Sequence, residues 1–115
     1  KIIGYGAATK GNIVLNHCQL DAKKIPLICD ENDEKFGRYT PGSNIKIIKK
    51  KYMRKLNPDY LLVLIWSFKS EVIKQELNYI KRGGKLIFHL PFLHIVDKEN
   101  YIKHLNENFD AFSYK

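Results

Sequence analysis

The sequence predicts an α/β fold, with a mostly parallel sheet of five or six strands and helices on both faces. Three observations support this prediction. Short apolar runs alternate with helical or loop segments, as they do in a parallel sheet with crossover connections. The longest apolar run, 60–66, has no polar position on either face. The 115 residues are 44% hydrophobic, enough for one domain with its own core.

The first half of the chain begins with a strand and a helix. Residues 1–3 form the end of a strand that stops at a glycine turn, and the apolar spacing in 11–18 fits a short helix. The apolar run 25–29 predicts a second strand that ends at Asp30. Residues 31–44 contain two glycines and a proline and predict a long loop.

The middle of the chain predicts two more strands around a short helix. Residues 45–48 hold three isoleucines and predict the third strand. Residues 50–56 predict a helix that Asn57-Pro58-Asp59 ends, because a residue before proline avoids helical geometry. We expect 60–66 to be the central strand, since a strand with one face in water would alternate apolar and polar residues.

The next segment predicts a longer helix and a fifth strand. Ser67 is placed to cap a helix whose apolar positions continue to Arg82, where Gly83-Gly84 ends it. Residues 85–90 predict the strand, which Pro91 closes.

The C-terminal residues predict a helix over 97–108 and a last short strand over 109–115. No linker, repeat or low-complexity tract divides the chain. We therefore assign 1–91 to the domain core and 92–115 to a C-terminal helix and strand of the same domain.

Composition excludes several classes of protein. No stretch approaches the roughly 18 apolar residues of a membrane helix, and the apolar fraction argues against disorder. Cys18 and Cys29 are too few for a disulfide scaffold, and the N-terminal residues do not have the layout of a secretory signal. We expect a cytoplasmic domain with no membrane partner.

The net charge of +8 is concentrated in one stretch, because 46–55 holds six basic residues and no acid. Such a stretch can bind nucleic acid or form a solvated helix face. We favour the solvated face, because aromatic residues are not interleaved with the lysines as a base-stacking surface requires.

A glycine turn lies between the first strand and the first helix. Gly4 permits a tight turn, and Gly6 lets the backbone approach a bound group in front of the helix N-terminus. The third glycine of the dinucleotide pattern would fall at Thr9 and is absent, while Gly11 comes two residues later. The turn also has a purely structural reading, since a strand-to-helix connection needs glycine anyway.

Polar residues around the turn suit a phosphorylated ligand. Lys10 could neutralise a phosphate, and Asn12 could cap the helix or donate to the same ligand. Asp30 lies 24 residues after Gly6, where doubly wound sheets place an acid for ribose hydroxyls. This acid could equally begin a turn.

The segment 4–12, GYGAATKGN, resembles the motif that opens the C-terminal domain of sugar C-methyltransferases. In that family it usually reads GYGA, two variable residues, then KGN. The similarity continues in order with Asp30, Asn32 and Lys35, and then with the loop 37–42 (GRYTPG) and Ile45. It extends through Pro58-Asp59-Tyr60 with Trp66 and Phe68, and through Gly83-Gly84 up to Pro91.

The resemblance implies a single Rossmann-like domain and a three-part enzyme. A zinc domain and a middle domain that binds S-adenosylmethionine would precede this domain, and the active site would lie between the last two parts. The catalytic histidine and tyrosine would belong to the middle domain. We therefore expect no catalytic residue, metal site or cofactor in this chain, and we expect the chain alone to be inactive.

The substrate that the resemblance implies is a nucleotide-linked sugar, and its pyrophosphate suits the glycine turn. Arg38 could close over the phosphates, and Tyr39 could stack on the base or sugar. Trp66 and Phe68 follow the central strand at the edge where such sheets bind ligands, although both could be core residues. The residues assigned to substrate binding are Gly4, Gly6, Ala7, Lys10, Gly11, Asn12, Asp30, Arg38, Tyr39, Trp66 and Phe68.

A free-standing dinucleotide-binding module of an oxidoreductase is the alternative. In that case Asp30 favours NAD over NADP, because a carboxylate repels a 2′-phosphate. The absent glycine at Thr9 argues against this reading. The partners we expect are therefore the sugar nucleotide and the upstream domains of the same enzyme.

Overall fold

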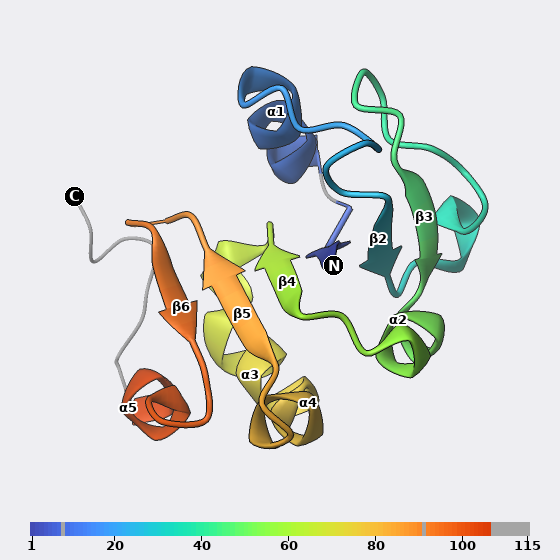
Figure 1. The fold of residues 1–115 in the computed structure, drawn as a ribbon. Helices are drawn as coiled ribbons and strands as arrows, with labels where there is room; N and C mark the ends of the chain where they lie inside the picture. The colour runs from blue at the N-terminus through green and yellow to red at the C-terminus, as the bar shows by residue number, and fades with distance from the viewer. Residues whose placement is uncertain (8, 91, 107–115) are drawn as a thin grey trace.

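The strands of the computed structural model form one six-stranded sheet (Figure 1). The structure describes residues 1–7, 9–90 and 92–106. The strand order is β3-β2-β1-β4-β5-β6, with β6 antiparallel to β5 and every other neighbouring pair parallel. The strands are β1 (Ile2–Tyr5), β2 (Leu27–Asp30), β3 (Lys46–Lys49), β4 (Tyr60–Val63), β5 (Lys85–Phe88) and β6 (His94–Val96). The predicted α/β fold with a mostly parallel sheet is confirmed.

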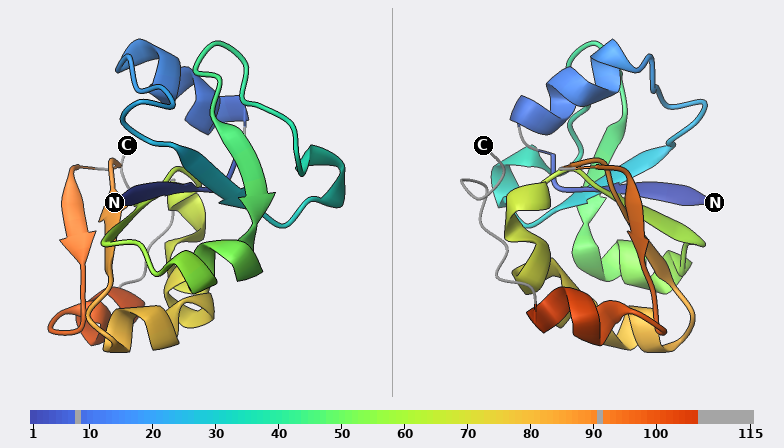
Figure 2. Two further views of the ribbon diagram at one scale, coloured as in Figure 1. Left: turned by 45° about the vertical axis from the view of Figure 1, so that its right-hand side comes forward. Right: turned by 90° about the vertical axis from the view of Figure 1, so that its left-hand side faces the viewer.

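Helices cover both faces of this sheet (Figure 2). One face carries α1 (Thr9–His17), and the other carries α2 (Lys50–Leu56), α3 (Lys69–Gln75), α4 (Leu77–Lys81) and α5 (Tyr101–Asn106). Short 3-10 helices follow β2 (η1, Asp33–Lys35) and precede α3 (η2, Trp66–Phe68). None of these described helices is long and apolar enough to span a membrane.

Two hydrophobic clusters lie on the two faces of the sheet. Under α1, Leu15 packs with Ile28, Ile47 and Leu64. The larger cluster joins residues of β1, β4 and β5 to α2, α3 and α4, and Tyr101 and Leu105 of α5 pack against it. Because both clusters are built from residues of this chain, the domain has its own core.

The strand order reverses at β1. Tyr5 is paired with Cys29 of β2 on one side and with Val63 of β4 on the other. The connection from β1 to β2 runs through α1, and the connection from β3 to β4 runs through α2 on the opposite face (Figure 2). Such a switch point leaves room for a ligand at the carboxyl ends of the two central strands.

The segment after β4 differs from the sequence prediction. The predicted strand 60–66 ends at Val63, and Trp66 lies in η2. The predicted cap Ser67 also lies inside η2, so Phe68 occupies the cap position of α3, where no side-chain cap bond is described. The single helix predicted up to Arg82 is divided into α3 and α4 at Glu76, whose backbone leaves helical geometry.

The C-terminal region also differs. The strand predicted over 85–90 ends at Phe88, and β6 was not predicted. The helix predicted from residue 97 begins at Tyr101, because Asp97 Oδ1 accepts the N–H of Asn100 and organises a turn before it. Residues 107–108 of that helix and the strand predicted over 109–115 lie outside the described residues.

Candidate functional site

The glycine turn lies at the carboxyl edge of the sheet, between the ends of β2 and β4. Gly6 has a φ of 93°, a left-handed value that favours glycine. Its N–H donates to the carbonyl of Cys29 at 2.8 Å, so the turn is joined to β2 as well as to β1. The chain then enters α1 at Thr9.

The glycines of the motif allow close packing of the backbone. A Cβ at Gly4 would meet Ile28, and a Cβ at Gly6 would meet Ile65. A Cβ at Gly11 would lie 2.7 Å from Cβ of Leu64. Gly11 therefore brings the helix close to the sheet, which is the role of the third glycine in dinucleotide folds. In the sequence, the third glycine of the dinucleotide pattern was expected at the position that Thr9 occupies, two residues earlier.

Asp30 binds the turn directly. Its Oδ2 accepts the N–H of Ala7 at 2.8 Å, and its Oδ1 accepts the N–H of Asn32 at 2.9 Å. Burial alone would raise the pKa of this carboxyl. The N–H donors and the Lys35 ammonium outweigh burial, so the pKa of Asp30 lies below its ordinary value. The acid predicted to hold a ribose is thus an ionised internal partner of the turn.

Lys35 completes this arrangement and was not among the predicted site residues. Its Nζ donates to the carbonyl of Ala7 at 2.8 Å and lies 3.6 Å from Oδ2 of Asp30. Both polar groups of the Ala7 backbone are therefore bonded to side chains, one at the end of β2 and one in η1. In the sequence, Lys35 was one of the residues that match the family between Asp30 and the loop 37–42, but it was given no role in binding.

The first turn of α1 contains Lys10, Gly11 and Asn12. The first four N–H groups of a helix have no partner within it, and the helix dipole makes this end positive. In the described part of the chain, no acid lies in this turn to neutralise it. The side chains of Lys10 and Asn12 lie outside what the structure describes, so their phosphate contacts remain predictions.

Trp66 and Phe68 lie in η2, which follows β4 at the carboxyl edge of the sheet. The N–H of Leu64 donates to the carbonyl of Tyr5 at 2.9 Å, which extends the β1–β4 pairing to the turn itself. Trp66 is half-buried and packs against the larger core cluster, while Phe68 is 56% exposed. The structure therefore gives Phe68 a surface available to a ligand at this edge.

Arg38 and Tyr39 are not brought to the glycine turn. The N–H of Ile47 donates to the carbonyl of Arg38, and Tyr39 forms an antiparallel bridge with Lys46. Residues 37–40 consequently run along the outer edge of β3, and both β3 and β2 separate them from β1. The same loop contacts α1, because Asn16 Nδ2 donates to the carbonyl of Pro41 at 3.1 Å.

His89 follows β5 at the same carboxyl edge. Its Nδ1 is buried and has no hydrogen-bond partner among the described residues. Burial lowers the pKa of His89, and a hydrogen bond to the backbone of Val63 only partly offsets this effect. The ring therefore favours its neutral form.

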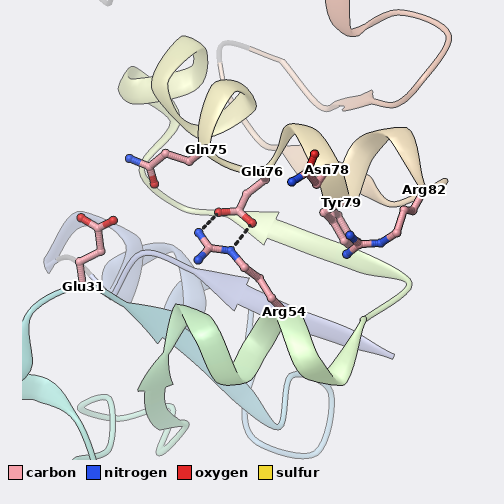
Figure 3. A pocket seen from close by; sticks show the side chains of 7 residues that line it. All are labelled: Glu31, Arg54, Gln75, Glu76, Asn78, Tyr79 and Arg82. Atoms are coloured by element: carbon pink, nitrogen blue, oxygen red, sulfur yellow. Dashed lines mark hydrogen bonds and ion pairs between the residues drawn. The ribbon is translucent and has the colours of Figure 1, made fainter.

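A polar groove of about 570 Å³ lies on the other side of the sheet, between α2 and the α3–α4 pair (Figure 3). Arg54 and Glu76 face each other across it and form two hydrogen bonds, of 3.0 and 2.7 Å. Glu76 is only 1% exposed. Sequence analysis missed this groove, although a glutamate at a core-facing helical position was a signal for it.

Comparisons with known proteins agree on one family. Residues 1–91 match the model of the C-methyltransferase C-terminal domain. The chain is also 33% identical over 99 residues to C-methyltransferase NovU of Streptomyces niveus. That alignment covers 86% of this chain and 24% of NovU, so the chain spans about a quarter of this relative's length.

Proposed function

The chain belongs to the C-methyltransferase C-terminal domain family, and from this we propose that it is the substrate-binding domain of a cytoplasmic C-methyltransferase. The proposed substrate is a nucleotide-activated sugar. The methyl donor and the catalytic base are held by upstream domains of the same polypeptide, which are this domain's partners.

The observation that carries the proposal is the place of the glycine turn. The N-terminus of α1 opens at the switch point between β1 and β4, beside Gly6. Unpaired N–H groups and a positive helix end suit a pyrophosphate. Phe68, exposed after β4, can stack on the base or sugar.

The proposed reaction is the methylation of a sugar carbon. A base removes the proton from a carbon next to a keto group, and the resulting carbanion takes the methyl group. S-adenosylmethionine supplies that methyl group as its sulfonium becomes a thioether. The residues of this domain bind and orient the sugar nucleotide, so that its carbon faces the domain that carries the base.

The bonds of Asp30 argue against a dinucleotide cofactor at the end of β2. In a dinucleotide site the acid after the second strand accepts hydrogen bonds from ribose. Here that carboxylate already accepts two N–H groups and has Lys35 beside it. The strand order favours the alternative, an NAD-binding module, but this engagement of Asp30 weighs against it.

The wider site remains part of the proposal. The first strand continues through Tyr5, so Gly4 lies within β1 and not in the turn, while Gly6 forms the turn and Gly11 brings α1 against the sheet. The first turn of α1, with Lys10 and Asn12, faces the pyrophosphate in this proposal. Arg38 and Tyr39 lie beyond β3, so we assign them an outer contact with the far end of the substrate.

A titration of the isotope-labelled chain tests this function by following backbone amide shifts. The panel is S-adenosylmethionine, NAD and uridine- or thymidine-diphosphate glucose. We expect only the sugar nucleotides to shift the amides of Gly6, Ala7 and Gly11. Shifts produced by NAD or S-adenosylmethionine alone, or by none of the panel, would contradict the proposal.

Two exposed aromatic residues provide a matched pair of variants. Phe68→Ala should weaken sugar-nucleotide binding about tenfold, as expected for a lost base-stacking contact. Tyr52→Ala removes a side chain that is 48% exposed on α2, and it should leave the affinity unchanged. Equal effects of the two substitutions would exclude Phe68 from the site.

A further inference from the structure

We propose that a polar network behind the sheet, buried at Tyr5 and Glu76, is a positioning device for the glycine turn. Its members come from β1, the residue after β2, α2, the end of α3 and the junction of α3 with α4. Four of them line the groove of Figure 3. The network consists of Tyr5, Glu31, Lys50, Arg54, Gln75 and Glu76.

Tyr5 joins the network to the turn from within the motif. It stands between Gly4 and Gly6, and its side chain is fully buried on the face opposite α1. Its hydroxyl donates to Oε2 of Glu76 at 2.9 Å. Burial, with the charge and hydrogen bond of Glu76, raises the pKa of Tyr5 far above its ordinary value. The hydroxyl therefore keeps its proton and remains a donor.

Glu76 is held in place to receive this bond. Arg54 binds both of its carboxylate oxygens, which fixes the plane of the carboxylate. The helix is interrupted at Glu76, where α3 ends and α4 begins. A charge this deeply buried is costly unless paired, so loss of either partner should disturb the others.

Lys50 connects the network to the end of β2, where Asp30 binds the turn. Its Nζ donates to Gln75 at 2.8 Å and to Glu31 at 2.9 Å, and it lies 4.6 Å from the ring centroid of Tyr5. Glu31 directly follows Asp30, the carboxylate that holds Ala7. One network thus constrains both the strand before the turn and the acid that binds it.

The inferred consequence is that Tyr5 and Glu76 act through the backbone of Gly6 and Ala7. Their part in ligand binding rests on the proposed function, whereas their hold on the turn does not. The experiment therefore has one arm without ligand and one arm with it.

The first arm measures amide hydrogen exchange of the free chain in Tyr5→Phe, which removes only the hydroxyl. Exchange at Gly6 and Ala7 should accelerate about tenfold relative to Leu86 in β5, as expected for a lost hydrogen bond to a charged group. Glu76→Gln should act in the same direction. Tyr79→Phe is the matched control, since this buried hydroxyl bonds Pro58 and Lys85 at the far end of the groove. The control should accelerate exchange at Lys85 and leave the turn unchanged.

The second arm measures the affinity of each variant for uridine-diphosphate glucose. We expect Tyr5→Phe to weaken it several-fold and Tyr79→Phe to leave it unaltered. If Tyr5→Phe affects Gly6 and Ala7 no more than Tyr79→Phe does, the positioning role is wrong. If the wild-type chain binds no sugar nucleotide while the exchange effect is seen, the proposed function fails and the positioning role stands.

Discussion

Asp30 illustrates, at the scale of single residues, how a side chain typical of ligand binding can serve as an internal partner. Its carboxylate satisfies the N–H of Ala7, a group that a bound phosphate would otherwise accept from. The pKa of Asp30 is lowered in the folded state. The stability it contributes is therefore present above the unfolded pKa of about 4 and is lost as pH falls through the lower folded value.

Asp30→Asn should destabilise the domain at pH 7 by about 2 kcal/mol, because hydrogen bonds to a charged acceptor are lost. As pH falls toward the folded pKa of Asp30, wild type loses the same charge, so the difference between the two proteins should shrink. Urea unfolding at pH 7 and at pH 3 measures this. Asp21→Asn is the control, because the Asp21 carboxylate accepts the N–H of Lys23 within an exposed turn. A difference between wild type and Asp30→Asn that did not change with pH would contradict this role.

At the scale of elements, close packing between β1, α1 and the neighbouring strands explains the glycines of the segment 4–12. Gly11 is a poor helix former, yet it occupies the first turn of α1 where the helix lies against Leu64. The requirement arises from the crossing of α1 over the extension of β4, and not from helix formation. The loop 37–42 also packs elements together. It pairs with the edge of β3 through Tyr39 and accepts a hydrogen bond from Asn16 of α1 at Pro41.

Gly11→Ala should destabilise the domain by about 1–3 kcal/mol through overpacking against Leu64, even though alanine favours a helix by about 1 kcal/mol. Thermal unfolding measures the sign, and amide shifts along α1 report the displacement of the helix. Gly37→Ala is the control, because no described atom lies within 4 Å of a Cβ placed at this position and its φ of 79° is what opposes the change. That control should leave the α1 amides in place, and a stabilised Gly11→Ala would refute the packing argument.

At the scale of the whole molecule, the glycine turn lies at the switch point of the sheet. The β1–β4 switch point places Gly6, the start of α1 and the segment after β4 at one edge. The chain nevertheless spans about a quarter of its relative. The function proposed here divides binding and chemistry between this domain and others.

The 115-residue chain should transfer no methyl group when supplied with labelled S-adenosylmethionine and a keto-sugar nucleotide. The reason is that the proposed base and donor site belong to other domains. Incorporation of label into the sugar measures this, and a full-length C-methyltransferase of the family provides the positive control. Turnover by the chain alone would show that this division between domains is wrong.

Local patterns in the sequence were sufficient for the order of the strands from β1 to β5 and for the family. The helix over Lys50–Leu56 was predicted with its observed limits, because a basic run and a proline stop are local signals. The segment 4–12 identified the turn and the resemblance. Apolar periodicity reports which face of an element is buried, and this is enough to indicate an α/β sheet.

Only the tertiary structure shows which residues of the predicted site are in contact. It separated Arg38 and Tyr39 from the turn, because that depends on the strand order. It gave Gly11 its packing role and Asp30 its internal partner, since both contacts cross between elements distant in sequence. It also divided the predicted helix at Glu76, whose carboxylate bonds Arg54 of α2 and Tyr5 of β1. Hydrogen bonds and close contacts between distant segments have no local signature, so they appear only when the sheet is assembled.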